Sequence, residues 1–337
     1  MTNPHLGEGG SLWVPPTARA TAPVAAYELG RSRDLRELRA RVRADALDYG
    51  NVLSRDLLMK HGVDDQMVRR EIHADRWRAH GRQTIAVHTG PMDVSADRWR
   101  AVWEVGAGIA VVDGVTALQA AGMTGYADDG IHVSVRHTAA VTPVDGVVIH
   151  KIASRLPDEG LLTGLPRTRP AIAAVRAATW ARTDRQAALL LVLPVQQRLI
   201  SGAQLLDASI RVRRRARRRL IQVLAGDIAN GSQSLGELDF VVACRRRGLP
   251  EPTRQAIRHL PNGRVYLDIE WEEARLAVEI DGAGHLFGLQ PAFDNLRQNA
   301  VMMRDTLLLR VDLIGWRIMP DAYLDQVTGA YFHRRAA

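Results

Sequence analysis

The first regular pattern of apolar residues along the chain has a helical period. Residues 1–30, rich in Gly, Pro, Ala and Thr, lack such a period and are expected to form a flexible N-terminal tail. From Arg31 onward, apolar residues recur at helical spacing within an arginine-rich segment. They are Leu35, Leu38, Val42 and Leu47. This pattern predicts a helix with a strongly basic exposed face.

The segment that follows has the pattern of a helix-turn-helix with a wing. We expect a short helix over 54–61, a second helix over 65–74 and an extended segment over 83–88. Together with the preceding basic helix, these elements form the predicted N-terminal DNA-binding region, residues 31–90. The alternative is a lobe of three helices that only packs on its neighbours.

Capping residues and a small apolar core support the two short helices. Ser54 and Asp64 are assigned as N-caps and Gly62 as the C-cap of the first helix. The expected core residues are Leu57, Leu58, Val63, Val68 and Ile72. The outer faces of the second helix carry the candidate DNA-binding residues Gln66, Arg69, Arg70 and His73. Such side chains can reach phosphates or base edges.

Residues 91–231 are expected to form a mixed α/β middle domain with an arginine-rich helix. Its pattern predicts a helix after Asp113, strands over 131–136 and 147–152, and helices from Pro170 onward. Seven arginines occupy nine positions between 211 and 219. They cannot share one helix face, so some are solvated while others can contact phosphates. The candidates are Arg213, Arg214, Arg217 and Arg218. A fully solvated surface is the alternative.

Composition adds a possible partner and excludes some classes of protein. The 337 residues carry 45 Lys and Arg against 37 Asp and Glu, a net charge of +8 that favours a polyanionic partner. The single cysteine, Cys244, excludes an internal disulfide framework and is expected in the core. No signal peptide is evident in the first residues, and the most apolar run, 187–195, is too short for a membrane span. We therefore expect a cytoplasmic protein without a membrane partner.

Candidate chemistry lies in two runs with period-two alternation, 264–271 and 275–281. A hairpin that pairs Trp271 with Leu276 brings Asp268 opposite Glu279. Their Cβ atoms would then be about 4.5 to 5.5 Å apart. Asp281 follows two residues further along the same face.

Like charges at this spacing are destabilising unless a proton or a divalent cation neutralises them. Carboxylate oxygens suit Mg²⁺ or Mn²⁺, which would act on a phosphate substrate. The alternative is an exposed acidic hairpin face without metal. Glu270, beside the turn, is the residue that best fits this alternative.

Three further residues could join this site. His285, in a Gly-rich loop, could act as a general acid or base, although a lone loop histidine is more often a surface residue. Glu237 could support the metal or belong to a capping box that begins at Ser234. Arg297 could reach a scissile phosphate or pair within its own helix.

At these residues the region 232–337 resembles the restriction-endonuclease-like PD-(D/E)XK domains of unknown function that are related to very-short-patch-repair endonucleases. The resemblance rests on Glu237, Leu-Asp268-Ile, Ala-Val-Glu279-Ile-Asp281-Gly, His285, Asp294-x-x-Arg297-Gln-Asn and Leu-Leu-Arg310-Val. It implies an αβββαβ core and a metal-dependent endonuclease. Asp268, Glu279 and Glu237 would then hold Mg²⁺ or Mn²⁺, with Asp281, His285 and Arg297 completing the catalytic set.

The chain departs from this family at one position. Asp281 stands where the wider superfamily carries the lysine of its Glu-x-Lys motif, and no lysine occurs in 232–337. Either Asp281 is an extra metal ligand, with His285 or Arg297 supplying the proton or charge chemistry, or the site is impaired.

The N-terminal region has a separate resemblance. Residues 48–90 are similar to the winged helix of AbiEi-type antitoxins, mostly at apolar positions. This implies DNA binding, and a cognate toxin as a second partner. Two hypotheses follow for this multidomain α/β (α+β) protein. One is a metal-dependent DNA endonuclease, and the other is a DNA-binding regulator or antitoxin with a degenerate nuclease domain. A basic protein-interaction module is the third and least specific possibility.

Overall fold

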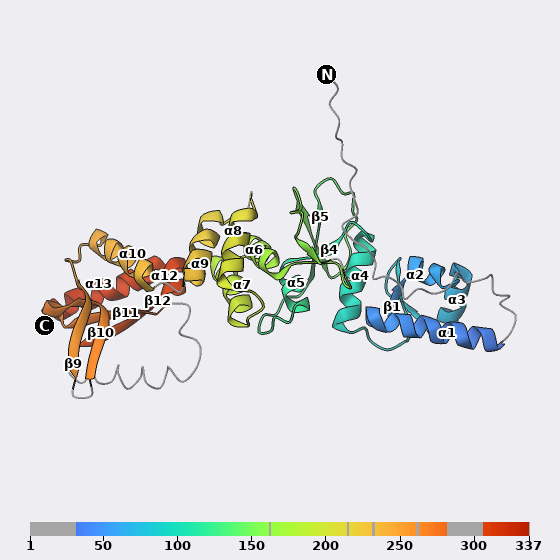
Figure 1. Cartoon of the computed structure of the whole chain (residues 1–337), viewed down its shortest axis with the longest axis horizontal. Helices are drawn as coiled ribbons and strands as arrows, with labels where there is room; N and C mark the ends of the chain where they lie inside the picture. Colours follow the sequence, from blue (N-terminus) through green and yellow to red (C-terminus); the bar gives the residue numbers. More distant parts are fainter. Residues whose placement is uncertain are drawn as a thin grey trace, which may run out of the picture. The chain divides into compact units, whose positions relative to one another are not determined.

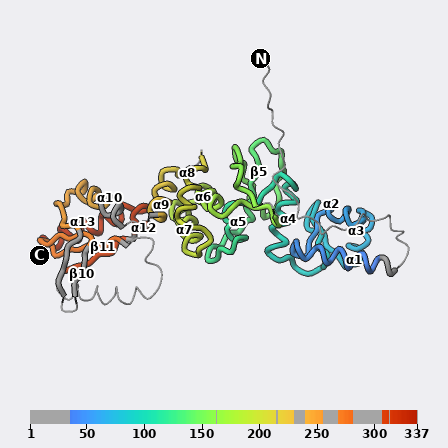
Figure 2. Tube along the Cα trace, viewed as in Figure 1, coloured from blue at the N-terminus to red at the C-terminus, as the bar shows by residue number. Residues whose placement is uncertain are grey.

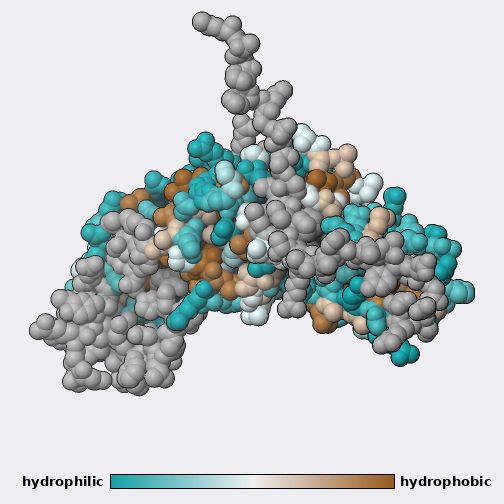
Figure 3. Space-filling view, turned by 45° about the vertical axis from the view of Figure 1, so that its right-hand side comes forward, coloured by the Kyte–Doolittle hydropathy of each residue, from teal (hydrophilic) through white to brown (hydrophobic). Residues whose placement is uncertain are grey.

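The computed structural model describes residues 32–161, 163–213, 216–230, 233–260, 263–281 and 306–336. Contacts divide the chain into two compact units, with the boundary between Ala177 and Ala178. Both units contain helices and β-sheets, which confirms the α/β class (Figures 1 and 2). On the face seen in Figure 3, the described residues include both hydrophilic and apolar areas. None of the described helices combines the length and apolar character that a membrane crossing requires.

Unit 1 begins with the predicted basic helix, α1 (Ser32–Ala46), followed by a 3-10 turn, η1 (Leu47–Tyr49). Leu38 and Val42 are buried as expected. The inclusion of Leu47 in the buried stripe is wrong, because 68% of this residue is exposed. The α-helix ends at Ala46, and the tighter turn brings Tyr49 into the core instead.

Along the chain, the strands of a small three-stranded sheet precede and follow the two predicted short helices. The elements are β1 (Val52–Ser54), α2 (Arg55–Lys60), α3 (Asp65–His73), β2 (Arg78–Ala79) and β3 (Thr84–Ala86). The strand order is β1-β3-β2, and both pairings are antiparallel. Ser54 Oγ accepts the Leu57 N–H at 3.2 Å and Asp64 Oδ1 accepts the Met67 N–H at 2.7 Å. Both predicted N-caps are therefore confirmed.

The end of α2 and the core of this lobe differ in detail from the prediction. His61 is the C-cap, and Gly62 is the next residue, with a φ of 81° that favours glycine. Leu58, Val63 and Val68 are buried as predicted. Leu57 and Ile72 are only partly buried. Met67 was not predicted to be buried but belongs to this core.

The remainder of unit 1 is a mixed five-stranded sheet with helices. Its elements are α4 (Val94–Gly106), β4 (Val111–Val112), α5 (Gly114–Ala120), β5 (Ile131–Arg136), β6 (Val147–Ile152), β7 (Gly160–Leu161), β8 (Arg167–Thr168) and the first part of α6 (Pro170–Trp180). The strand order is β6-β5-β4-β8-β7, with β5–β6 and β4–β8 parallel. The predicted helix after Asp113 and the strands 131–136 and 147–152 are confirmed.

Unit 2 combines a helical part with a mixed four-stranded sheet. The helices are α7 (Asp184–Gln196), α8 (Gly202–Arg211), α9 (Arg218–Asn230), α10 (Gln233–Arg246), α12 (Leu313–Ile318) and α13 (Pro320–Ala336). The strands are β9 (Thr253–Leu260), β10 (Gly263–Trp271), β11 (Leu276–Asp281) and β12 (Leu307–Asp312), in the order β12-β11-β10-β9. Among these described strands, β11 and β12 form the one parallel pair. A 3-10 turn, η2 (Glu272–Ala274), joins β10 to β11.

One face of this sheet forms the core of unit 2. Alternate residues of β10 and β11, including Trp271 and Val278, pack with side chains of α10, α12 and α13. Phe240 of α10 contacts Trp316 of α12 edge-on, with ring centroids 5.4 Å apart. Cys244 is buried here as predicted, and burial raises the pKa of its thiol to about 12. The thiol is therefore a packing group and is protonated at neutral pH.

Candidate functional site

Helix α3 presents one polar face and one buried face. Gln66, Arg69, Arg70 and His73, the predicted DNA-binding residues of this helix, are all exposed. On the opposite side, Met67, Val68 and Glu71 are buried. Because the buried face holds the helix on the lobe, the four polar side chains face solvent on a fixed support. This is the arrangement that a helix entering a DNA groove requires.

Glu71 links α3 to α1 through Arg39, and it also binds Arg76, which follows α3. Its carboxylate accepts from Arg39 of α1, with Nη2 to Oε1 at 2.6 Å, and from Arg76, with Nε to Oε2 at 2.6 Å. Burial opposes ionisation of Glu71, but the hydrogen bonds from Arg76 and Arg39 lower its pKa below the usual value. These contacts were not predicted, because the Glu71 and Arg39 positions are 32 residues apart.

The turn between β2 and β3 is anchored from two sides. The Glu104 carboxylate of α4 accepts the N–H groups of Arg82, Gln83 and Thr84 at 2.8 to 2.9 Å. It also accepts from the Thr84 hydroxyl at 2.7 Å. Gly81 is favoured beside it, because its φ is 144° and a Cβ there would lie 2.4 Å from the Glu104 carboxyl carbon, so the anchoring carboxylate would have to move. The sequence predicted an extended segment over 83–88, but it predicted neither β2 nor the contact with Glu104.

Arg55 links this turn to α3. Its Nε donates to the carbonyl oxygen of Arg82 at 2.7 Å, and its Nη1 lies 2.5 Å from Asp65 Oδ1 at the start of α3. Helix α3 and the β2–β3 turn are therefore connected by one guanidinium as well as by the backbone. The polar face of α3 and the turn are held in a fixed relation to each other.

We expect Glu104→Ala to destabilise unit 1 by about 1–3 kcal/mol, because it removes the charged acceptor of three backbone N–H groups. Hydrogen exchange should show faster exchange at the amides of Arg82, Gln83 and Thr84, with α3 less affected. Asp97→Ala, which removes an ion pair to Arg100 on the same helix, is the matched control. Unchanged exchange at all three amides in Glu104→Ala would contradict the anchoring role.

The acidic hairpin of unit 2 has the register that the sequence predicts. Trp271 pairs with Leu276, and Ile269 pairs with Val278. Continuing this register by one residue brings Asp268 opposite Glu279. Asp268 Oδ2 also accepts the Ile280 N–H at 2.8 Å, so one carboxylate oxygen is fixed against β11. The two carboxylates therefore belong to neighbouring strands on one face of the sheet.

Arg310, which was not considered as a source of charge for the acidic pair, lies beside Glu279. Arg310 of β12 is the parallel partner of Glu279, and its Nη2 lies 3.4 Å from Glu279 Oε2. The negative charge of this face is therefore partly balanced by the Arg310 guanidinium. A guanidinium is a third way to neutralise the acidic pair, besides a proton or a metal ion. The alternative of an exposed acidic hairpin face is wrong for Glu279 and Glu270, which are only 4% and 3% exposed.

Several candidate residues lie outside the described part of the chain. His285 and Arg297 are among them, and so is Arg214. Glu237 lies in α10 and Asp281 ends β11, but their side chains are also outside the description. Within the described residues, no group of three or more His, Cys, Asp or Glu side chains forms a metal-binding cluster.

The expectation of an arginine-rich helix is wrong. The described arginines of the run are divided between the last residue of α8, the connecting segment and the start of α9. Arg217 has a φ of 56° and serves a structural role, since its Nε lies 2.6 Å from Asp184 Oδ1. Its Nη2 also donates to the Arg182 carbonyl oxygen at 3.2 Å. Arg213 and Arg218 are exposed.

A buried ionic network in unit 1 has no counterpart in the sequence analysis. The Arg176 guanidinium donates to Asp113 Oδ2 and to Glu159 Oε2, both at 2.7 Å. Arg155 donates to Glu159 Oε1 at 3.0 Å and to the Ser134 carbonyl oxygen at 2.7 Å. Two arginines and two carboxylates therefore balance one another inside the five-stranded sheet unit.

Comparisons with known proteins do not assign the chain to a family. No family model matches it, and no curated protein matches it. Among solved structures, the RV2827C protein from Mycobacterium tuberculosis is similar at 18% sequence identity, over 56% of this chain and 78% of that chain, with a TM-score of 0.36. A likeness at this TM-score does not establish a shared fold. Both family resemblances therefore stay predictions.

Proposed function

We propose that the protein binds duplex DNA, with α3 as the helix that contacts the groove. The observation that carries this proposal is the exposed set Gln66, Arg69, Arg70 and His73 on a helix whose opposite side is buried. Arginine recognises phosphates and guanine edges, and Gln can pair with adenine. The net charge of +8 supports a polyanionic partner.

The order of elements around α3 supports the same proposal. Two short helices precede a β2–β3 hairpin, and β1 completes a three-stranded sheet of order β1-β3-β2. We interpret this as a winged helix-turn-helix, with the β2–β3 turn as the wing. Glu104 and Arg55 then act as positioning residues for the wing. A DNA-binding element whose position is fixed in this way loses little conformational entropy on binding.

Replacing both Arg69 and Arg70 by alanine is expected to weaken duplex binding about tenfold or more at moderate salt. The slope of log K against log salt should fall by about 2, since each lost phosphate contact releases one counterion fewer. Fluorescence anisotropy with a labelled duplex at several salt concentrations measures both quantities. Because both side chains are exposed, the fold should be unaffected.

The matched control replaces Arg245 and Arg246 of α10 by alanine, which removes the same net charge from unit 2. Its affinity should stay within about threefold of the wild-type value. Equal losses in the two double variants would mean that binding follows overall charge alone, and the role of α3 would be rejected.

A second candidate function is phosphodiester hydrolysis at the acidic face of β10 and β11. The observation that favours it is the Asp268–Ile280 hydrogen bond, which fixes a carboxylate on the strand next to Glu279. Asp268 and Glu279 are hard oxygen donors and fit a cation of the Mg²⁺ or Mn²⁺ type. The distance of 3.4 Å between Arg310 Nη2 and Glu279 Oε2 is longer than that of a strong charge-assisted hydrogen bond. Glu279 can therefore still bind a cation with Arg310 beside it.

When bound there, the cation would polarise the phosphodiester and lower the pKa of a water molecule. Asp268 would act with one oxygen toward the metal and the other on the Ile280 N–H. Glu237 and Asp281 are the candidates for further ligands, His285 for proton transfer and Arg297 for stabilising charge on the phosphate.

The alternative to hydrolysis is a DNA-binding regulator or antitoxin whose unit 2 has no catalytic role, with a toxin protein as a further partner. Asp281 in the place of a motif lysine supports this alternative. It predicts duplex binding without metal and no change of activity in Asp268 variants. Hydrolysis predicts the reverse, so the same variants separate the two functions.

A further inference from the structure

A depression of about 560 Å³ lies in unit 1 beside the end of α3. Its walls come from the end of α1, the residue before β1, the residues after α3 and the residues after β3. Val52 and Arg78 both pair with Ala86 near the end of β3, and the depression opens at this end of the small sheet. The β2–β3 turn is at the opposite end. The depression is therefore separate from the β2–β3 turn interpreted as the wing.

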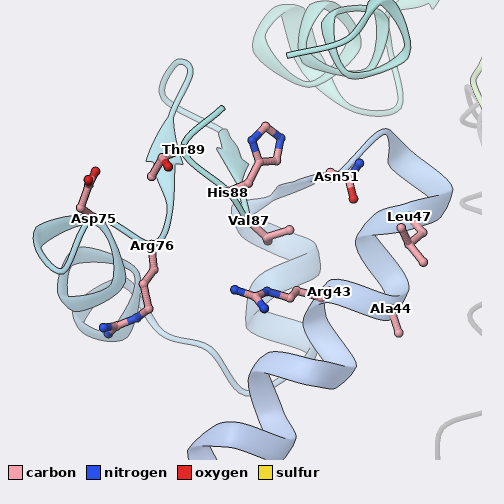
Figure 4. A pocket seen from close by; sticks show the side chains of 9 residues that line it. All are labelled: Arg43, Ala44, Leu47, Asn51, Asp75, Arg76, Val87, His88 and Thr89. Atoms are coloured by element: carbon pink, nitrogen blue, oxygen red, sulfur yellow. The ribbon is translucent and has the colours of Figure 1, made fainter. Parts of the chain in front are cut away.

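The polar side chains around the depression suit an anionic group. Arg43 is exposed, and Figure 4 shows its side chain extending from α1 toward the segment that carries Asp75 and Arg76. Asn51, His88 and Thr89 add groups that can donate hydrogen bonds. A guanidinium with nearby neutral donors is a common solution for binding phosphate.

The two arginines that line the depression, Arg43 and Arg76, differ in their contacts within the protein. Arg76 is committed to Glu71 through two hydrogen bonds, at 2.6 and 3.1 Å. Among the described residues, Arg43 has no hydrogen-bond or ion-pair partner. Arg43 is therefore the cation that an incoming anion can bind without breaking a contact within the protein.

Asp75 and an apolar wall add requirements beyond charge. The Asp75 carboxylate lines the depression and can accept hydrogen bonds from hydroxyl or amino groups of a ligand. Leu47 and Val87 belong to the lining. Leu47 is 68% exposed, so it supplies an apolar surface that a ligand can contact. A ligand with a phosphate group, hydrogen-bond donors and a partly apolar body would satisfy all three features.

We propose that this depression binds a small phosphorylated molecule that also carries hydroxyl or amino groups, such as a nucleoside monophosphate or a sugar phosphate. The phosphate would bind Arg43, with Asn51, His88 or Thr89 as neutral donors, and Asp75 would accept from the ligand. The volume lies within the range of about 300–1,000 Å³ that small-molecule sites occupy. Since Asp75 and Arg76 follow the C-cap residue of α3, Ala74, the bound molecule would lie beside the end of the helix proposed to contact DNA.

The full chain is tested by isothermal titration with AMP and glucose 6-phosphate, and with adenosine and glucose as uncharged counterparts. At least one phosphorylated probe should bind, with its uncharged counterpart at least tenfold weaker. Arg43→Gln should lower the affinity for that probe about tenfold or more, because it removes a charge-assisted hydrogen bond. Arg36→Gln, an exposed arginine of α1 that does not line the depression, should bind like the wild type.

Asp75→Asn tests the second feature of the site. This variant should lose the preference for the phosphorylated probe over inorganic phosphate, since the acceptor for its hydroxyl or amino groups is weakened. The proposal is overturned if neither probe binds more tightly than its counterpart, or if Arg43→Gln binds as tightly as the wild type. Because no DNA is present, failure here is distinguishable from failure of the proposed DNA binding.

Discussion

Asp268→Asn is expected to reduce metal-dependent cleavage of duplex DNA by about 100-fold or more. A catalytic cation supplies several kcal/mol of stabilisation to the transition state, and each 1.4 kcal/mol corresponds to a factor of about ten. The amide has nearly the same shape as the carboxylate, and its oxygen can still accept the Ile280 N–H. The loss would therefore report the missing charge rather than a collapsed hairpin. Plasmid and linear duplex cleavage with Mg²⁺, with Mn²⁺ and with chelator measures it.

Glu272→Gln is the matched control for this prediction. Glu272 lies in the turn of the same hairpin and is exposed, so its neutralisation should leave the cleavage rate unchanged. Asp268→Asn should still bind duplex DNA with wild-type affinity, because α3 belongs to unit 1. Cleavage by the wild type that persists in chelator, or equal rates for Asp268→Asn and the wild type with Mg²⁺, would reject the hydrolytic site. Duplex binding without any cleavage would favour the regulator.

Arg176→Met is expected to destabilise unit 1 by about 3–5 kcal/mol. Removing one partner of a buried ionic network leaves its opposite charges uncompensated. Arg176, Asp113 and Glu159 are all buried, and burial opposes the charge on Arg176. Coulombic attraction to Asp113 and Glu159 nevertheless raises the pKa of Arg176. Urea unfolding followed by tryptophan fluorescence, to which Trp99 and Trp103 of the unit 1 core contribute, measures the change.

Arg169→Met is the matched control, since it is exposed and its Nε donates to the Asp158 carbonyl oxygen at 2.8 Å. Its effect should be within about 1 kcal/mol. A loss below 1 kcal/mol for Arg176→Met as well would show that methionine packs in the site without leaving the carboxylates charged. The network would then contribute little net stability.

Local patterns in the sequence were sufficient to predict much of the fold. Ser54 and Asp64 identified the starts of two short helices, because a capping side chain acts on a backbone N–H only three residues away. The register of Trp271 with Leu276 followed from period-two alternation and a four-residue connection. These interactions span few residues, so one sequence contains the information needed to assign them.

Contacts between distant segments could not be predicted in this way. Arg176 and Asp113 are 63 residues apart, and the Glu104 contacts join α4 to a turn 20 to 22 residues earlier. The pairing of Glu279 with Arg310 depends on a parallel strand that begins only at Leu307, and local patterns do not predict which distant strand pairs with β11. The error at Leu47 has a local cause, since the helical period was continued past Ala46, where α1 ends.

The central claim, that α3 lies against DNA, is tested most directly by site-specific photo-crosslinking. A benzophenone amino acid would replace Gln66 of α3 in one variant and Met59 of α2 in another, both exposed positions of the same lobe. With a labelled duplex, we expect crosslinking from position 66 and little from position 59, at salt concentrations where binding is retained. Crosslinking from position 59 alone, or none from position 66 while the duplex is bound, would contradict the account.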